Sequence, residues 1–175
     1  MAKARKMLCN LEAEYTQNLM RLIETQSKAT LANWALDYAE ATYLPIYLKY
    51  YPNDPRPKAA IDAARDWLSG KLKLPVVKPI ISEVHEAARE AEDIPSAQAA
   101  ARAIGQAAST IHSASHCLGL AFYGTAAVAY ESFGTEADPD FYERVTKEEC
   151  LRVTEALQAM AVENEPNPAK VKWYC

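Results

Sequence analysis

The stretch from Ser96 to Gly134 constrains the fold most, because its composition offers nothing that would stop a helix. It contains no proline and is rich in alanine, the strongest helix former. An unbroken helix of about 38 residues would exceed about 55 Å, which is more than the width of a domain of this size. The stretch must therefore break. We expect the break in "HSASH" (112–116), where two serines can bond the local backbone instead.

The N-terminal part of the chain shows the apolar spacing of amphipathic helices. Five apolar residues recur at intervals of three and four within 8–25: Leu8, Leu11, Tyr15, Leu19 and Leu22. Ser27 or Thr30 is placed to cap a second helix over 31–51. Pro45 should kink that helix, because proline lacks a backbone donor and crowds the preceding turn.

Prolines, a glycine and a serine mark the ends of the next helices. Pro57 suits the first turn of a helix that Gly70 ends. A further helix begins between Pro75 and Pro79 and runs to about residue 92. Ser96 can cap the long stretch that follows.

The sequence therefore predicts an all-α fold. Thr146 and Glu149 in "TKEE" form a capping box at which the last helix should begin, and the tail "NEPNPAKVKWYC" should be irregular. No segment alternates apolar and polar residues at period two. We expect one compact domain over 1–175 with about six or seven helices, partly in antiparallel pairs. The first 26 or so residues and the tail after about 163 are expected to be peripheral.

Charge and cysteine usage limit the classes of partner. A net charge of -4 leaves no basic surface for a phosphate backbone, so we expect no nucleic-acid partner. No apolar run reaches the about 20 residues of a membrane span, and the first residues lack the apolar core of a signal peptide. We therefore expect a cytoplasmic protein without a membrane partner. The cysteines lack CxxC spacing and are expected to be reduced thiols: Cys9, Cys117, Cys150 and Cys175.

The histidines form the first candidate site. If the helix ran through the expected break, His112 and His116 would lie one turn apart on one face, a spacing that can bind a transition metal. His85 and Glu86, on the preceding helix, are the nearest further ligands in kind. The alternative, which the sequence favours, is that the histidines bond neighbouring groups where two core helices meet.

Two carboxylates, Asp37 and Glu40, extend this possible polar cluster. With Arg56, Arg65 or Arg89 they could form ion pairs that fix helix packing. A carboxylate pair near histidines is also what a hydrolytic site would use. A divalent transition metal is expected only under this hydrolase hypothesis, and otherwise no cofactor is expected.

Tyrosines form the second candidate site. Tyr43, Tyr47 and Tyr50 follow the i, i+4, i+7 spacing of one helix face, and Tyr51 comes next. Tyrosine brings a large contact area and a hydroxyl group, which suits a protein interface. The same spacing is typical of a core, so both interpretations stay open.

Four stretches resemble the Imm-5-like family of bacterial immunity proteins: "LANWALDYAE", "YYPNDPRPKAAIDAARDWLSG", "VHEAARE" and "AARAIGQAASTIHSASHCLGLAFYGTAAVAYE". They span about residues 31 to 131. The resemblance implies a small all-helical protein that neutralises a toxin by binding it, and it assigns no catalytic residue. The first 26 or so residues and the end from about Gly134 look like additions to the family pattern.

Three functional hypotheses follow. The leading one is a cytoplasmic protein that binds and inhibits a cognate toxin stoichiometrically through a surface of tyrosines and acidic residues, which would suit a basic nuclease toxin. The second is the metal-dependent helical hydrolase, with His85, His112, His116 and either Glu86 or Asp37. The third is a self-associating scaffold in which the tyrosine stripe forms a homodimer interface. The sequence leaves catalysis open and favours a binding protein.

Overall fold

The computed structural model describes residues 4–173. Eight α-helices follow one another there: α1 (Glu14–Ile23), α2 (Lys28–Tyr38), α3 (Leu44–Tyr50), α4 (Arg56–Leu68), α5 (Leu74–Glu90), α6 (Pro95–Ser109), α7 (Cys117–Phe133) and α8 (Pro139–Met160). A π-helical turn, Ala39–Tyr43, joins α2 to α3, so that these two form one continuous helical run and the described residues contain seven such helices. No strand occurs within 4–173, which confirms the all-α prediction.

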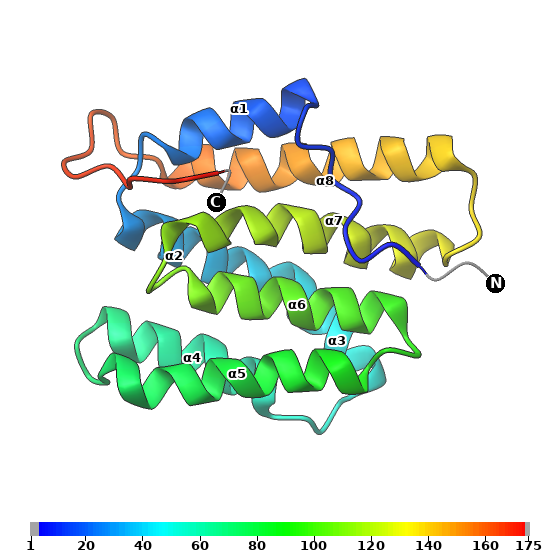
Figure 1. Cartoon of the computed structure of the whole chain (residues 1–175), viewed down its shortest axis with the longest axis horizontal. Coiled ribbons are helices and arrows are strands. Elements are labelled where there is room, and N and C mark those ends of the chain that lie inside the picture. The colour runs from blue at the N-terminus through cyan, green and yellow to red at the C-terminus, as the bar shows by residue number, and fades with distance from the viewer. Residues whose placement is uncertain (1–3, 174–175) are drawn as a thin grey trace.

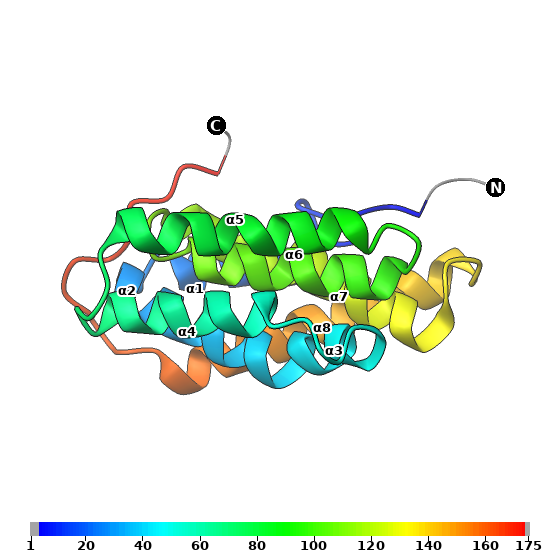
Figure 2. The ribbon, with the colours of Figure 1, turned by 90° about the horizontal axis from the view of Figure 1, so that it is seen from below.

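The helices lie side by side along the long axis of the molecule (Figure 1). Helices α4 and α5, α5 and α6, α6 and α7, and α7 and α8 pack as neighbouring pairs joined by short connections. Figure 2 shows α5 along one edge of the bundle, with α6 next to it on the inside and α3 and α4 beyond. Helix α6 lies in the middle and contacts α2, α3, α4, α5 and α7.

Alanine makes the central position of α6 possible. Seven alanines of this helix are buried: Ala97, Ala99, Ala100, Ala101, Ala103, Ala107 and Ala108. Because the distance between packed helices depends on the side chains at their contact, alanine on every side lets several helices approach α6 at once. The alanine-rich stretch of the sequence is therefore the centre of the core.

The break between α6 and α7 confirms the prediction for "HSASH". Helix α6 ends at Ser109, a short 3₁₀ turn spans Ala114–His116, and α7 begins at Cys117. The hydroxyl groups of Ser113 and Ser115 lie 3.1 Å apart and form a hydrogen bond with each other. The break lies where we expected it, but the two serines bond each other and not the local backbone.

Pro45 acts through the turn that precedes it. The helix widens to π geometry over Ala39–Tyr43, and Pro45 then lies in the first turn of α3. A widened turn is one way in which a helix accommodates the missing donor and the ring of a proline. The predicted kink is thus a π-helical insertion.

Three predicted helix starts are wrong. The first helix begins at Glu14, not near Leu8. Helix α6 begins at Pro95, with Ile94 as its N-cap, so Ser96 is a buried residue of the first turn and not the cap. Pro95 sets the start because its fixed φ angle suits a first helical position.

The third wrong start concerns the capping box in "TKEE". Helix α8 begins at Pro139, and the carboxylate of Asp138 caps it by accepting a hydrogen bond from the Asp140 amide at 2.9 Å. Thr146 and Glu149 therefore lie in the middle of α8 and are buried. The spacing that resembles a capping box places both side chains on the face of α8 that meets the core.

Both ends of the chain pack onto the bundle. Helix α1 lies against α8, and the side chains of Leu19 and Ile23 are completely buried. In the tail, the amide of Ala169 donates to the carbonyl of Gln26 at 2.8 Å. Thus the N-terminal segment that we expected to be peripheral supplies part of the core, while the tail is irregular and attached to the surface.

A buried carboxylate ties the first half of the chain to α8. Glu149 is 1% exposed and accepts hydrogen bonds from the hydroxyl groups of Tyr38 at 2.7 Å and Tyr43 at 3.0 Å. Its other oxygen accepts from Nε of Arg152 at 3.0 Å. Burial and the charge of Glu149 raise the pKa of Tyr43, so its hydroxyl group remains a donor. The carboxylate therefore satisfies two buried hydroxyl groups at once.

Replacing this carboxylate should destabilise the protein. Glu149→Ala leaves the hydroxyl groups of Tyr38 and Tyr43 without their acceptor, and we expect the free energy of unfolding to fall by about 3 kcal/mol. Urea unfolding followed by circular dichroism measures this change. Glu148→Ala, at the exposed neighbouring position, is the control and should alter stability by no more than about 0.5 kcal/mol. Equal effects of the two variants would contradict the role of Glu149.

Gly124 allows Tyr43 to reach this carboxylate. A methyl group at Gly124 would lie 2.0 Å from the hydroxyl oxygen of Tyr43, which is completely buried. We expect Gly124→Ala to lower the free energy of unfolding by about 1–3 kcal/mol, because Tyr43 has no room to move. Gly119→Ala is the control, since the three atoms nearest to its methyl group belong to the flexible side chain of Gln106. A thermal unfolding comparison in which Gly124→Ala is the more stable variant would refute this account.

Candidate partner-binding surface

The predicted tyrosine stripe divides into buried and exposed members. Tyr43 and Tyr47 are 0% and 1% exposed, which corrects their assignment to a partner-binding surface or a homodimer interface. Their rings fill the core, and the hydroxyl group of Tyr47 donates to Asp54 at 2.6 Å. Tyr51 is half-buried and stacks on Tyr47, whereas Tyr50 is 37% exposed. Only Tyr50 and Tyr51 can contribute to a surface.

The carboxylates Asp37 and Glu40 form ion pairs with Arg65 of α4. One guanidinium nitrogen of Arg65 lies 2.8 Å from Asp37, and the other bonds Glu40. Lys58 lies 3.2 Å from Glu40. Burial opposes ionisation of Glu40, but the hydrogen bonds from Arg65 and Lys58 outweigh it and lower its pKa. These carboxylates therefore connect α2 and the π turn to α4.

The other arginines proposed as partners bind elsewhere. Arg56 pairs with Asp54 at 2.8 Å and with Glu90 at 2.6 Å. Arg89 pairs with Glu86, which lies one turn before it on α5. Glu86 is thus already occupied by a cation of its own helix.

Two of the histidines lie against each other where α6 gives way to α7. The ring centroids of His112 and His116 are 5.3 Å apart, edge to face. Nδ1 of His116 lies 2.9 Å from the side-chain oxygen of Gln106. Burial lowers the pKa of both imidazoles, and it also lowers the pKa of His85, which faces Gly105 of α6. The uncharged forms are therefore favoured at neutral pH.

The predicted metal cluster does not assemble in the geometry of the described chain. Within 4–173, no three side chains of histidine, cysteine, aspartate or glutamate come together as metal ligands. Glu86 and Asp37 face Arg89 and Arg65 instead. The metal-dependent hydrolase stays a prediction without a ligand set.

Exposed aromatic residues gather where α7 ends and α8 begins. Phe133, the last residue of α7, is 44% exposed, and Phe141 of α8 is 42% exposed. Their ring centroids lie 5.5 Å apart. The guanidinium carbon of Arg144 lies 4.7 Å from the centre of the Phe141 ring. Large apolar rings that remain accessible side by side are typical of protein-binding surfaces.

Acidic residues lie close to this aromatic pair along the chain. Glu136, Asp138 and Asp140 are exposed in and after the turn between α7 and α8. Glu131, two residues before Phe133, accepts from the hydroxyl group of Tyr50 at 2.8 Å and pairs with Lys49. Tyr50 of the predicted stripe is therefore held beside the end of α7. We call Tyr50, Phe133, Phe141 and the acidic residues Glu131, Glu136, Asp138 and Asp140 the aromatic–acidic end of the bundle.

A groove of about 580 Å³ adjoins the aromatic–acidic end. The N-terminal segment forms one wall through Arg5 and Leu8, and Tyr130, Tyr142 and Glu143 form another. The hydroxyl group of Tyr130 donates to the carbonyl of Arg5 at 2.6 Å and fixes this segment across α7. The groove therefore combines apolar rings with charged groups of both signs.

The floor of the groove contains a polar atom without a partner. The hydroxyl oxygen of Thr146 is buried and has no hydrogen-bond partner in the described part of the chain. Buried polar atoms are usually paired, so an unpaired one beside a groove is a donor and acceptor that a ligand or partner can use.

The sequence contains one signal for this surface, a pair of phenylalanines on either side of an acidic turn. Phe133 and Phe141 flank "GTEADPD", a turn rich in acidic residues between two helices. Aromatic residues that border an acidic turn are poor candidates for a core. Because the capping box predicts that the last helix begins at Thr146, it leaves Phe141 outside any predicted helix.

Comparisons with known proteins support one family. A family model described as "Imm-5 like putative immunity protein" matches residues 21–160. The match includes α8, so the region from Gly134 to Met160 belongs to the family pattern and is not an addition to it. The comparisons with curated proteins and with solved structures gave no match. None of the helices within 4–173 combines the length and the apolar character that crossing a membrane requires.

The histidines predict a pH dependence of stability. Their pKa values are lowered from 6.5 in the folded protein, so the unfolded chain binds more protons below about pH 6.5. Their contribution is therefore complete above pH 6.5 and is lost as the pH falls through the lower folded values. We expect the free energy of unfolding to decrease between pH 7.5 and 5.5. Urea unfolding at several pH values measures the slope.

A variant without imidazoles provides the control. The chain has three histidines, so His85→Gln, His112→Gln and His116→Gln together remove all of them from a protein prepared without a histidine tag. This variant should show a flatter pH dependence between pH 5.5 and 7.5. An unchanged slope would show that other groups carry the dependence.

Proposed function

Because the chain belongs to the Imm-5-like family of immunity proteins, we propose that it binds a cognate toxin in a one-to-one complex and neutralises it through the aromatic–acidic end. The observation that carries this location is the exposed pair of Phe133 and Phe141 within an acidic surface. The proposal concerns a binding protein, and it assigns no catalytic residue.

The aromatic pair supplies the apolar centre that a tight interface needs. Interface energy concentrates in a few large side chains that become fully desolvated, and aromatic residues are prominent among them. Phe133 and Phe141 are held in place by their own helices and by contact with each other. Little side-chain entropy is therefore lost when a partner covers them.

The charges around the pair indicate what kind of surface a partner presents. Glu136, Asp138 and Asp140 are exposed near the pair, and Arg144 is the cation in contact with it. Acidic groups attract a basic surface and accelerate association. We therefore propose a toxin with a basic face, as nucleic-acid-degrading enzymes often have, whose substrate-binding surface would be blocked.

The N-terminal segment adds a part that the family model does not cover. Arg5 and Leu8 line the groove beside the aromatic–acidic end but lie before residue 21, where the family match begins. A wall outside the family pattern is a suitable place for determinants of partner choice. We propose that this wall helps the protein to distinguish its cognate toxin from related ones.

We also propose that the protein acts in the cytoplasm, where an immunity protein would meet a toxin before or during its attack. The support for this proposal is that the cysteines lack CxxC spacing, which suits reduced thiols; Cys175 lies outside the described residues.

The first experiment identifies the toxin and tests neutralisation. The tagged protein is expressed in its native cells, and any protein bound at one-to-one stoichiometry is identified and then expressed alone. We expect this protein to arrest growth alone and to be harmless when both are expressed together. A stoichiometric partner that is harmless alone, or whose toxicity persists during co-expression, would contradict the proposed function.

Variants then test the location of the interface. Phe133→Ala combined with Phe141→Ala should weaken toxin binding by about tenfold or more, because each ring contributes to the desolvated centre. Reversing the charge of Glu136 and Asp140 to lysine, which leaves the Asp138 cap of α8 in place, should also weaken binding and reduce its dependence on salt. Calorimetric titration at two salt concentrations measures both effects.

Matched controls lie at the opposite end of the bundle. Val76→Ala removes an exposed apolar side chain from the start of α5, and Asp66→Lys reverses a partly exposed charge, paired with Lys71, near the end of α4. Both should bind the toxin like the unaltered protein. If the controls weaken binding as much as the variants at the aromatic–acidic end, the proposed location is wrong.

A further inference from the structure

We propose that the protein has a phosphate-binding pocket between the N-terminal segment and α6, beside the larger groove and apart from the aromatic–acidic end. The pocket has a volume of about 70 Å³ and shares Ala4, Arg5 and Tyr130 with the larger groove. One ordered water needs about 10–15 Å³ of such space, so the pocket has room for a phosphate group.

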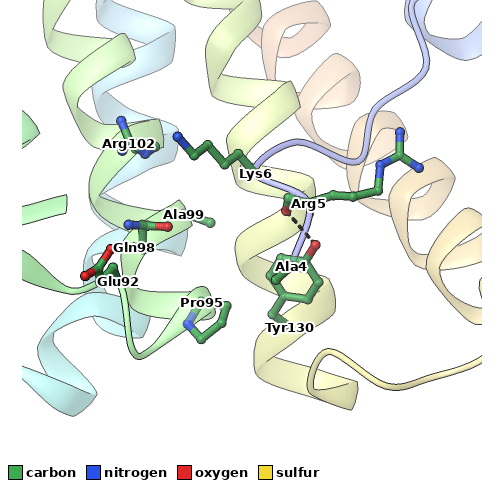
Figure 3. Close-up of a pocket in the computed structure, with 9 residues that line it drawn as sticks. All are labelled: Ala4, Arg5, Lys6, Glu92, Pro95, Gln98, Ala99, Arg102 and Tyr130. Carbon is green, nitrogen blue, oxygen red and sulfur yellow. Dashed lines mark hydrogen bonds between the residues drawn. The ribbon is translucent and has the colours of Figure 1, made fainter. Parts of the chain in front are cut away.

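Two cations meet at this pocket. Figure 3 shows the side chains of Arg102, from α6, and Lys6, from the N-terminal segment, pointing toward each other. In the described part of the chain, neither forms an ion pair with a carboxylate. The side chain of Arg5 points away from them (Figure 3). Two like charges that converge without an acidic partner would be stabilised by an anion between them.

The guanidinium group of Arg102 also contains a polar atom without a partner. Its Nε is buried and has no hydrogen-bond partner within 4–173. A buried charged donor is costly unless it is paired, and unpaired examples in native proteins commonly mark a bound ion or water. This observation is independent of the convergence with Lys6.

The remaining lining selects among oxyanions. Glu92 and Gln98 lie next to each other on the side of the pocket formed by the start of α6 (Figure 3). The amide nitrogen of Gln98 donates to the carbonyl of Ala88 at 2.8 Å, which leaves the side-chain oxygen as an acceptor. A hydrogen phosphate ion offers oxygens to the two cations and a hydroxyl group to Glu92 or Gln98. Sulfate and carboxylate lack that hydroxyl group, so the pocket should prefer phosphate.

The pKa of His85 can report phosphate binding, because the charge of Arg102 affects it. Burial is the main cause of the lowered pKa of His85, and the charge of Arg102 is the next. A phosphate ion on Arg102 would offset that charge and raise the pKa of His85. The pKa of His112 is lowered by burial, His116, Lys78 and Lys28 but not by Arg102, so this imidazole is the control.

The experiment is an NMR titration of the full chain with sodium phosphate in a cationic buffer, compared with sodium sulfate and sodium chloride at equal ionic strength. We expect a saturable phosphate-dependent rise in the pKa of His85 with little change at His112, and about threefold or more weaker binding of sulfate. Phosphoserine at the same concentrations shows whether the pocket accepts a phosphate ester or the free ion.

Variants distinguish this pocket from general ionic effects. Arg102→Gln should weaken phosphate binding about tenfold or more, and Lys6→Gln, an exposed position that does not endanger folding, should weaken it several-fold. Lys147→Gln changes the same charge on the exposed surface of α8 and should bind phosphate normally. The proposal is overturned if chloride or sulfate acts like phosphate, or if all three variants respond like the unaltered protein. None of these outcomes depends on toxin binding.

Discussion

The close approach of five other helices to α6 is the constraint on which the rest of the structure depends. It requires small side chains on nearly every side of one helix, and α6 meets this requirement with alanines. Only one stripe of α6, with Gln98, Arg102 and Gln106, keeps partial contact with solvent, so most charged residues lie on the helices around it. The proposed toxin-binding surface therefore lies on the outer helices and on the segments that connect them, whereas the proposed phosphate pocket uses this stripe of α6.

At the contact between α8 and the π turn, buried hydroxyl groups require a hydrogen-bond acceptor. Tyr38 and Tyr43 reach into the core with hydroxyl groups that need an acceptor, and Glu149 supplies it with Arg152 as counterion. A buried carboxylate beside an arginine has the composition of a catalytic site. Its full engagement by two tyrosines and an arginine shows that it holds the helices together.

The fold was largely predictable, because helix composition, prolines and the broken stretch at "HSASH" are local signals. Local signals failed where tertiary contacts decided the outcome. Thr146 and Glu149 have the spacing of a capping box, but that spacing also places two side chains on one face of a longer helix. For the same reason, helical spacing could not show that Tyr43 is buried and that Tyr50 is exposed.

The candidate site was harder to predict than the fold, because its parts come from distant segments. Phe133 and Phe141 meet across a turn, and Tyr50 joins them through Glu131 only once α3 lies beside α7.

The measurement that tests the account most directly is hydrogen exchange of the one-to-one toxin complex, read by mass spectrometry. The account predicts slower exchange over 131–143 and no change at the turn between α4 and α5. Protection of that turn, with 131–143 unchanged, would contradict it.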